Sequence, residues 1–125
     1  MNVDELLSRA RGKLLRVTAA EAAAELAGGA LLVDIRPADE RARDGSVPGA
    51  TLIDRNVLEW RLDPASQWRS PVLRSPDQRV IVLCAEGFQS SLAAANLQEL
   101  GLVNATDVID GFGGWLAAGL PVARE

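Results

Sequence analysis

The 125-residue sequence contains no histidine, no tyrosine and a single cysteine, Cys84. Without histidine the chain cannot form a catalytic pair with an imidazole base, and it lacks the commonest ligand of zinc sites. One cysteine excludes an internal disulfide and any metal site built from several cysteines. The thiol, the carboxylates, the hydroxyl groups and the backbone are therefore the remaining candidates for chemistry.

The sequence also lacks a basic cluster and a long apolar run. Its formal net charge is −4 and its arginines are scattered among acidic residues, so we expect no nucleic-acid partner. No apolar stretch is long enough to cross a bilayer, and residues 1–17 contain acids without the continuous apolar region of a secretory signal. We therefore predict a cytoplasmic protein with no membrane partner.

The composition is that of a folded globular chain. Hydrophobic residues make up 48% of the sequence and charged residues 24%, far from the low-hydrophobicity, high-charge range of disordered chains. The length suits one domain, which we expect to span residues 1–125.

Helical and strand patterns alternate along the chain. Thr18 and Glu21 form a capping-box pattern that predicts a helix ending at Gly28 and Gly29. Short apolar runs predict strands at residues 30–35, 51–53, 80–84 and 105–110; helices are predicted at 36–45, 54–62, 90–101 and 112–119, and a long surface loop with three prolines at 63–78.

This alternation predicts an α/β fold with a mainly parallel sheet covered by helices on both faces. In such folds ligands bind at the carboxyl ends of the strands. Cys84 lies at that edge, because it ends the apolar run VIVLC and a helical pattern follows shortly after it. The position favours a functional cysteine, although a free cysteine is also a common buried core residue.

The loop after Cys84 has features that can stabilise a sulfur anion. A thiol reacts as its thiolate, and the first turn of a helix offers unpaired N–H groups and the positive end of the helix dipole. Gly87 can adopt a positive φ angle, so residues 84–89 could curl until several N–H groups point at the sulfur. Ser90 is predicted to be the N-cap of the following helix.

The pattern Cys-x-x-Gly-x-x-Ser at a strand-to-helix turn resembles the active-site loop of the rhodanese family of sulfurtransferases. Three further segments are similar to motifs of that family, and with TAAEAAAEL the resemblance covers residues 15–122. These segments are LLVDIRPADE (31–40), GSVPGA (45–50) and GFGGWLAAGLPV (111–122). The resemblance implies a single rhodanese-like domain with a five-stranded, mainly parallel sheet and helices on both faces.

The resemblance also implies a sulfur relay without a metal or an organic cofactor. Cys84 would be the nucleophile that takes sulfur from a small anionic donor such as thiosulfate, holds it as a persulfide and passes it to cyanide or a thiol. The expected substrate-binding residues are Ala85, Glu86, Gly87, Phe88, Gln89 and Ser90, together with Arg36 as a source of positive charge.

Some positions depart from the family pattern. Gln89 stands where many members have arginine and can donate only neutral hydrogen bonds, and Glu86 places a carboxylate in the loop. Ser46 replaces the usual histidine of a turn motif. A cysteine phosphatase needs arginine six residues after its cysteine, and that position is Ser90, so phosphate ester hydrolysis is not expected.

Two functional hypotheses therefore stay open: a sulfurtransferase, or a relay or protein-binding module that exchanges sulfur with a protein donor or acceptor. Arg36 could instead form a structural ion pair with Asp34. Trp60 and Trp68 could line the pocket or close a core or partner surface, Trp115 is expected in the core, and residues 39–44 are expected to form a solvated helical face.

Overall fold

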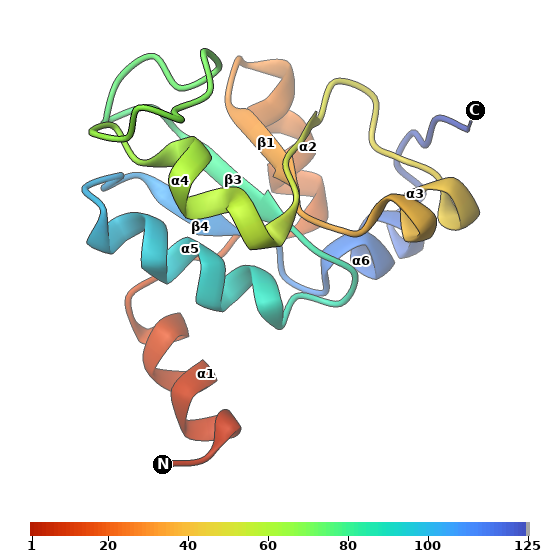
Figure 1. Ribbon diagram of the computed structural model, residues 1–125. Helices are drawn as coiled ribbons and strands as arrows, with labels where there is room; N and C mark the ends of the chain where they lie inside the picture. Colours follow the sequence, from red (N-terminus) through yellow and green to blue (C-terminus); the bar gives the residue numbers. More distant parts are fainter. Residues whose placement is uncertain (125) are drawn as a thin grey trace.

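A parallel sheet forms the centre of the computed structural model, which describes residues 1–124. Its strands are arranged in the order β2-β1-β3-β4, with Leu31 of β1 beside Val80 of β3 and Val80 beside Ala105 of β4. All pairs are parallel, so the carboxyl ends of the strands meet at one edge (Figure 1). The strands are β1 (Leu31–Asp34), β2 (Thr51–Leu52), β3 (Val80–Leu83) and β4 (Ala105–Asp107).

The sheet differs from the expected five strands, because the described residues form four. Beside β4, on the side away from β3, Val17 makes a single parallel bridge with Val108. The Val17 N–H donates to the Asp107 carbonyl (3.1 Å), and the Ile109 N–H donates to the Val17 carbonyl (2.8 Å). Residues 13–18 link α1 to α2, and this bridge is the one β pairing that the structure describes for them.

Helices cover both faces of the sheet, as expected (Figure 1). Because side chains alternate along a strand, Val80 and Val82 of β3 pack into the cluster with α4 and α5, while Ile81 and Leu83 pack with α2 and α6. Trp115 of α6 is buried in the second cluster, which confirms its predicted place in the core. The helices are α2 (Ala19–Ala27), α3 (Ala38–Asp44), α4 (Leu58–Leu62) after the 3₁₀ turn η1 (Arg55–Val57), α5 (Gln89–Glu99) and α6 (Gly111–Ala117).

The capping box at the start of α2 is confirmed. The Thr18 side chain accepts a hydrogen bond from the Glu21 N–H (3.1 Å), and the Thr18 N–H donates to the Glu21 carboxylate (2.8 Å). These bonds lower the pKa of Glu21 below its ordinary value, and the bond from the Thr18 backbone has the largest effect. The predicted loop at 63–78 is also confirmed, since this segment contains neither helix nor strand.

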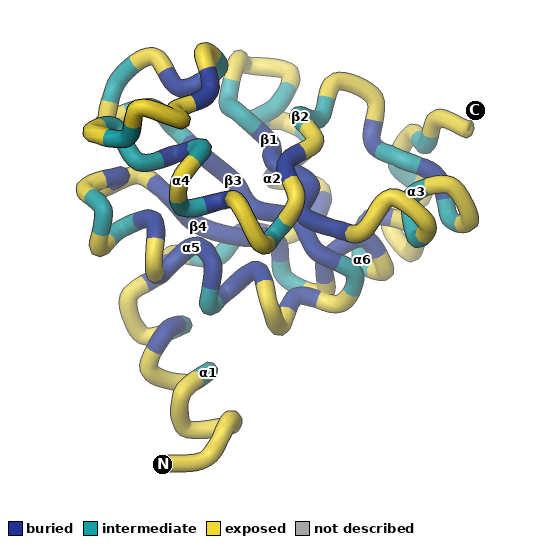
Figure 2. Tube along the Cα trace, viewed as in Figure 1, coloured by how far each residue is buried: buried dark blue, intermediate teal, exposed yellow. Residues whose placement is uncertain are grey.

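Helix α1 (Val3–Gly12) was not predicted. Asn2 caps it by accepting a hydrogen bond from the Glu5 N–H (2.9 Å), and acids in its first turn and arginines in its last turn complement the helix dipole. The helix lies against α5 and is largely exposed (Figure 2). None of the helices in residues 1–124 combines the length and the hydrophobicity of a transmembrane segment.

Candidate active site

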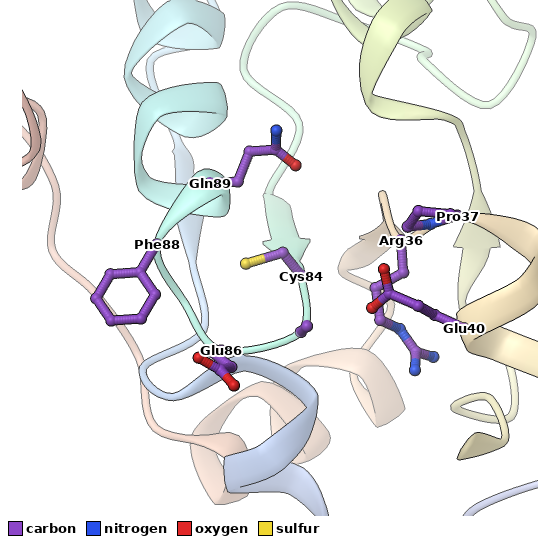
Figure 3. A pocket seen from close by; sticks show the side chains of 8 residues that line it. Arg36, Pro37, Glu40, Cys84, Glu86, Phe88 and Gln89 are labelled. Carbon is purple, nitrogen blue, oxygen red and sulfur yellow. The ribbon is translucent and has the colours of Figure 1, made fainter. Parts of the chain in front are cut away.

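Cys84 lies directly after β3, at the edge of the sheet where the strands end. Its sulfur accepts hydrogen bonds from the N–H groups of Gly87 (3.2 Å) and Ser90 (3.3 Å). Figure 3 shows the sulfur turned into the arc formed by the following loop. The side chain is largely buried, with 6% of the residue exposed. The loop therefore curls around the sulfur with N–H groups pointing at it, as predicted, and this arrangement favours negative charge on the sulfur.

Helix α6 holds the first two carbonyl groups of the loop on the side away from the sulfur. The Phe112 N–H donates to the Cys84 carbonyl (2.8 Å), and the Gly113 N–H donates to the Ala85 carbonyl (3.0 Å). In a trans peptide the C=O and N–H point in opposite directions, so these bonds turn the next N–H groups away from α6. A Cβ at Gly111 would lie 2.4 Å from the Cys84 carbonyl oxygen, so only glycine permits this close packing.

Gly87 has the positive φ angle that the sequence predicted. Its φ is +86°, a region that favours glycine. A Cβ at this position would lie 2.9 Å from the backbone nitrogen of Asp110. The backbone conformation and the close approach of the Asp110 backbone therefore both require glycine at position 87.

The prediction that Ser90 caps α5 was wrong. The helix begins at Gln89, and Phe88 occupies the N-cap position without a side-chain hydrogen bond. The Ser90 hydroxyl instead donates to the Asp107 carboxylate (2.7 Å). This bond is assisted by the charge of the buried carboxylate. Ser90 thus reaches the sulfur through its backbone N–H and β4 through its side chain.

Beneath the loop lies a polar network that sequence reasoning missed. Asp107 is fully buried and accepts hydrogen bonds from Ser90, from Ser91 (2.8 Å) and from Arg16 Nε (2.9 Å). Arg16 and Arg11 both also donate to the Gly87 carbonyl. A polar residue at the end of an apolar strand could have pointed to Asp107, but no local signal marks the two arginines.

A cavity of about 200 Å³ opens beside the sulfur. It has room for several water-sized groups. Six of the predicted site residues line it, whereas Gly87 and Ser90 contact the sulfur through their backbone N–H groups. The lining residues are Arg36, Pro37, Glu40, Cys84, Ala85, Glu86, Phe88 and Gln89.

Arg36 borders this cavity, but its guanidinium group is engaged elsewhere. It pairs with the buried carboxylate of Asp34 (2.8 Å) and donates to the Gly45 carbonyl (2.9 Å). It also stacks on the ring of Phe112 at 3.9 Å, and its end points away from Cys84 (Figure 3). The expected ion pair of Asp34 and Arg36 is therefore present, and Asp34 neutralises the charge of Arg36.

The cavity wall carries two further carboxylates, those of Glu40 and Glu86. Glu86 is exposed, and its carboxylate points away from the sulfur (Figure 3).

Trp60 and Trp68 are also exposed and do not border this cavity. Of residues 39–44, some are exposed and others half-buried. Across residues 1–124, no cluster of His, Cys, Asp or Glu side chains has the arrangement of a metal site.

The chain is similar to known proteins in sequence and in structure. The model of a family described as "Rhodanese-like domain" matches residues 18–118. A curated relative, the thiosulfate sulfurtransferase GlpE of Actinobacillus succinogenes, is 50% identical over 46 residues. That match covers 37% of this chain and 41% of the relative, so the chain spans less than half of the relative's length.

Three solved structures are similar over most of the chain. A protein of unknown function from Rhodopseudomonas palustris, titled a possible tyrosine phosphatase, is 33% identical, with a TM-score of 0.90 over 98% of this chain and 95% of that one. A rhodanese-related protein from Thermoplasma volcanium is 28% identical (TM-score 0.69; 88% and 98%). The polysulfide-sulfur transferase homodimer of Wolinella succinogenes is 23% identical and shares the fold (TM-score 0.77; 97% and 86%).

Proposed function

The chain belongs to the rhodanese-like domain family, and we propose that it is a sulfurtransferase in which Cys84 carries sulfane sulfur as a persulfide. The observation that carries the proposal is the pair of N–H groups, from Gly87 and Ser90, that donate to the Cys84 sulfur. A thiolate and a persulfide are both anions, and fixed N–H donors stabilise both without a histidine base.

The proposed transfer has two steps. The Cys84 thiolate attacks the outer sulfur of thiosulfate, a new S–S bond forms, and the S–S bond of thiosulfate breaks as sulfite leaves with the electron pair. In the second step cyanide attacks the outer sulfur of the persulfide, thiocyanate leaves and the Cys84 thiolate is restored. A thiolate acceptor takes the same sulfur and becomes a persulfide.

Phosphate ester hydrolysis has less support at this site. The position six residues after Cys84 is Ser90, whose hydroxyl donates to Asp107 rather than to the cavity. The one arginine that lines the cavity, Arg36, is neutralised by Asp34. A phosphate dianion would therefore meet a guanidinium group whose charge Asp34 already balances, which is a poor site for bidentate binding of phosphate.

A second candidate function is a sulfur relay that works with a protein partner. Glu40 and Glu86 border the cavity, Gln89 is neutral, and Asp34 neutralises Arg36, so the cavity wall repels a small dianion such as thiosulfate. A persulfide presented by a partner protein carries less charge and would meet less repulsion. This candidate predicts that sulfur loading requires the partner.

Intact mass spectrometry tests the proposal. The mass of the purified protein is measured before and after incubation with thiosulfate, and again after addition of cyanide, with Cys84→Ser as the control. A gain of one sulfur atom that requires Cys84 and disappears with cyanide is the expected result. No adduct on a thiol that alkylates readily favours the relay, and a thiol that does not alkylate contradicts both functions.

A further inference from the structure

The carbonyl of Gly87 is held by two arginines from the N-terminal part of the chain. Arg11 Nη2 donates to it at 2.8 Å and Arg16 Nη2 at 3.0 Å. Arg11 lies in the last turn of α1, and Arg16 lies in the link between α1 and α2. Hydrogen bonds from charged donors are stronger than neutral ones, so the two guanidinium groups together fix the orientation of this peptide unit.

That orientation determines where the next N–H group points. In the trans peptide between Gly87 and Phe88, the Phe88 N–H points opposite to the Gly87 carbonyl, and therefore away from the two arginines. In the described part of the chain, the Phe88 N–H has no hydrogen-bond acceptor. It is thus a free donor in the same loop whose neighbouring N–H groups, those of Gly87 and Ser90, already contact the Cys84 sulfur.

The two arginines differ in whether an acidic side chain neutralises their charge. Arg16 forms an ion pair with the buried Asp107 carboxylate (2.9 Å), so its charge is neutralised. Among the ion pairs of residues 1–124, none involves Arg11. Arg11 instead donates to Ser91 Oγ (3.1 Å) and lies over the Phe88 ring at 5.6 Å. It therefore leaves a net positive charge behind a loop in which Gln89 is neutral.

We propose that Arg11 and Arg16 are positioning residues that clamp the Gly87–Phe88 peptide, aim its N–H at sulfur carried by Cys84 and make α1 part of the active site. Both residues precede the segment matched by the family model, 18–118. The part of this inference that concerns sulfur transfer rests on the proposed function. The part that concerns the reactivity of the Cys84 thiol does not.

Two rates test the clamp in the full-length protein. The first is alkylation of the thiol by iodoacetamide across a pH series, which reports on one site because the chain has one cysteine. The second is sulfur loading from thiosulfate, followed by intact mass. The variant is Arg11→Ala, which keeps a good helix former in α1 and leaves the Arg16–Asp107 pair intact. Arg9→Ala is the control, because Arg9 is an exposed arginine of the same helix.

We expect Arg11→Ala to slow both reactions about tenfold, the loss typical of a hydrogen bond to a charged group, and to move the pH midpoint of alkylation upward. Arg9→Ala should stay within about twofold of the wild type. If Arg11 merely stabilised the fold, Arg11→Ala would speed alkylation instead, because a looser loop exposes the buried thiol. An alkylation rate in Arg11→Ala that is unchanged or faster overturns the proposal.

Arg16 needs a milder substitution, because removing it leaves the buried Asp107 carboxylate unpaired. Arg16→Lys keeps a positive charge beside Asp107 but loses the fork that reaches both Asp107 and Gly87. We expect alkylation to slow several-fold, and a wild-type rate contradicts the role of Arg16. If the wild type takes up no sulfur while Arg11→Ala still slows alkylation, the proposed function fails and the clamp on the thiol stands.

Discussion

The Ser90 hydroxyl donates a 2.7 Å hydrogen bond to the buried carboxylate of Asp107, while the N–H of the same serine donates to the Cys84 sulfur. Ser90 therefore connects Asp107, the last residue of β4, to the Cys84 sulfur, which follows the end of β3. Because Asp107 is fixed in turn by Arg16, the position of the Ser90 N–H is set by a buried network rather than by the loop alone.

Ser90→Ala should lower both stability and sulfur loading. The substitution removes a hydrogen bond to a charged acceptor, which costs about 2 kcal/mol of unfolding free energy. The first turn of α5 is then free to shift, so the N–H leaves the sulfur and persulfide formation slows. Urea unfolding and the loading rate measure the two effects, with the exposed Ser8→Ala in α1 as the control. A wild-type rate of sulfur loading in Ser90→Ala would contradict the role of the Ser90–Asp107 hydrogen bond in holding the Ser90 N–H at the sulfur.

Gly87→Ala should be among the most damaging small substitutions. Its φ of +86° disfavours any side chain, and the added Cβ would lie 2.9 Å from the Asp110 nitrogen. Forcing alanine into this conformation costs about 1–3 kcal/mol, or else the loop moves and the N–H leaves the sulfur. Gly12→Ala is the matched control, since a Cβ there meets nothing within 4 Å. We expect Gly12→Ala to be neutral or stabilising in urea unfolding, and equal effects of the two substitutions would refute this explanation.

Much of the fold and the loop could be predicted from local patterns. The runs of apolar residues, the Thr18–Glu21 capping box and the glycine after the cysteine each depend on residues close in sequence. The same reasoning correctly paired Asp34 with Arg36, two residues apart. It also assigned Ser90 to the N-cap, because the pattern gave no sign that a buried carboxylate from β4 would take up its hydroxyl.

The part that could not be predicted consists of contacts between distant residues. Arg11 is 76 residues from Gly87 in sequence, and Arg16 is 91 residues from Asp107. No short motif joins such positions, so the sequence predicted neither α1 nor its contact with the loop. Ala10 is the one buried residue of α1, so few of its side chains mark a face that packs against the core. The fifth strand was expected from resemblance, and the short link around Val17 supplies one bridge in its place.

The capping box of α2 gives the protein a measurable pH dependence. Hydrogen bonds from the Thr18 backbone and side chain lower the pKa of Glu21 in the folded protein. A lowered pKa in the folded state adds stability above the ordinary pKa of glutamate, and that stability is lost as the pH falls through the lowered value. The difference in unfolding free energy between wild type and Glu21→Gln should therefore shrink from pH 7 toward pH 3. A difference that is constant over this range would contradict the capping role.

Glu86→Gln should improve the use of thiosulfate. The carboxylate borders the cavity, so it repels an approaching anion, and the amide keeps its size without its charge. We expect the KM for thiosulfate to fall about two- to threefold at low salt, and the gain to vanish near 1 M salt, where the Debye length is about 3 Å. Glu5→Gln, which removes an exposed carboxylate of α1, is the control. A gain that persists at high salt would show that charge is not its cause.

Gln89→Arg tests whether the cavity lacks a cation. Gln89 lines the same cavity as Cys84, and the one arginine there is neutralised by Asp34. A guanidinium group at position 89 can pair with the sulfonate end of thiosulfate, so we expect kcat/KM for thiosulfate to rise about tenfold. Gln89→Met keeps a long side chain without charge and should give no gain. An increase in both variants would assign the effect to loss of the amide, whereas no increase in Gln89→Arg would mean that small anions are not the donors for which this cavity is built.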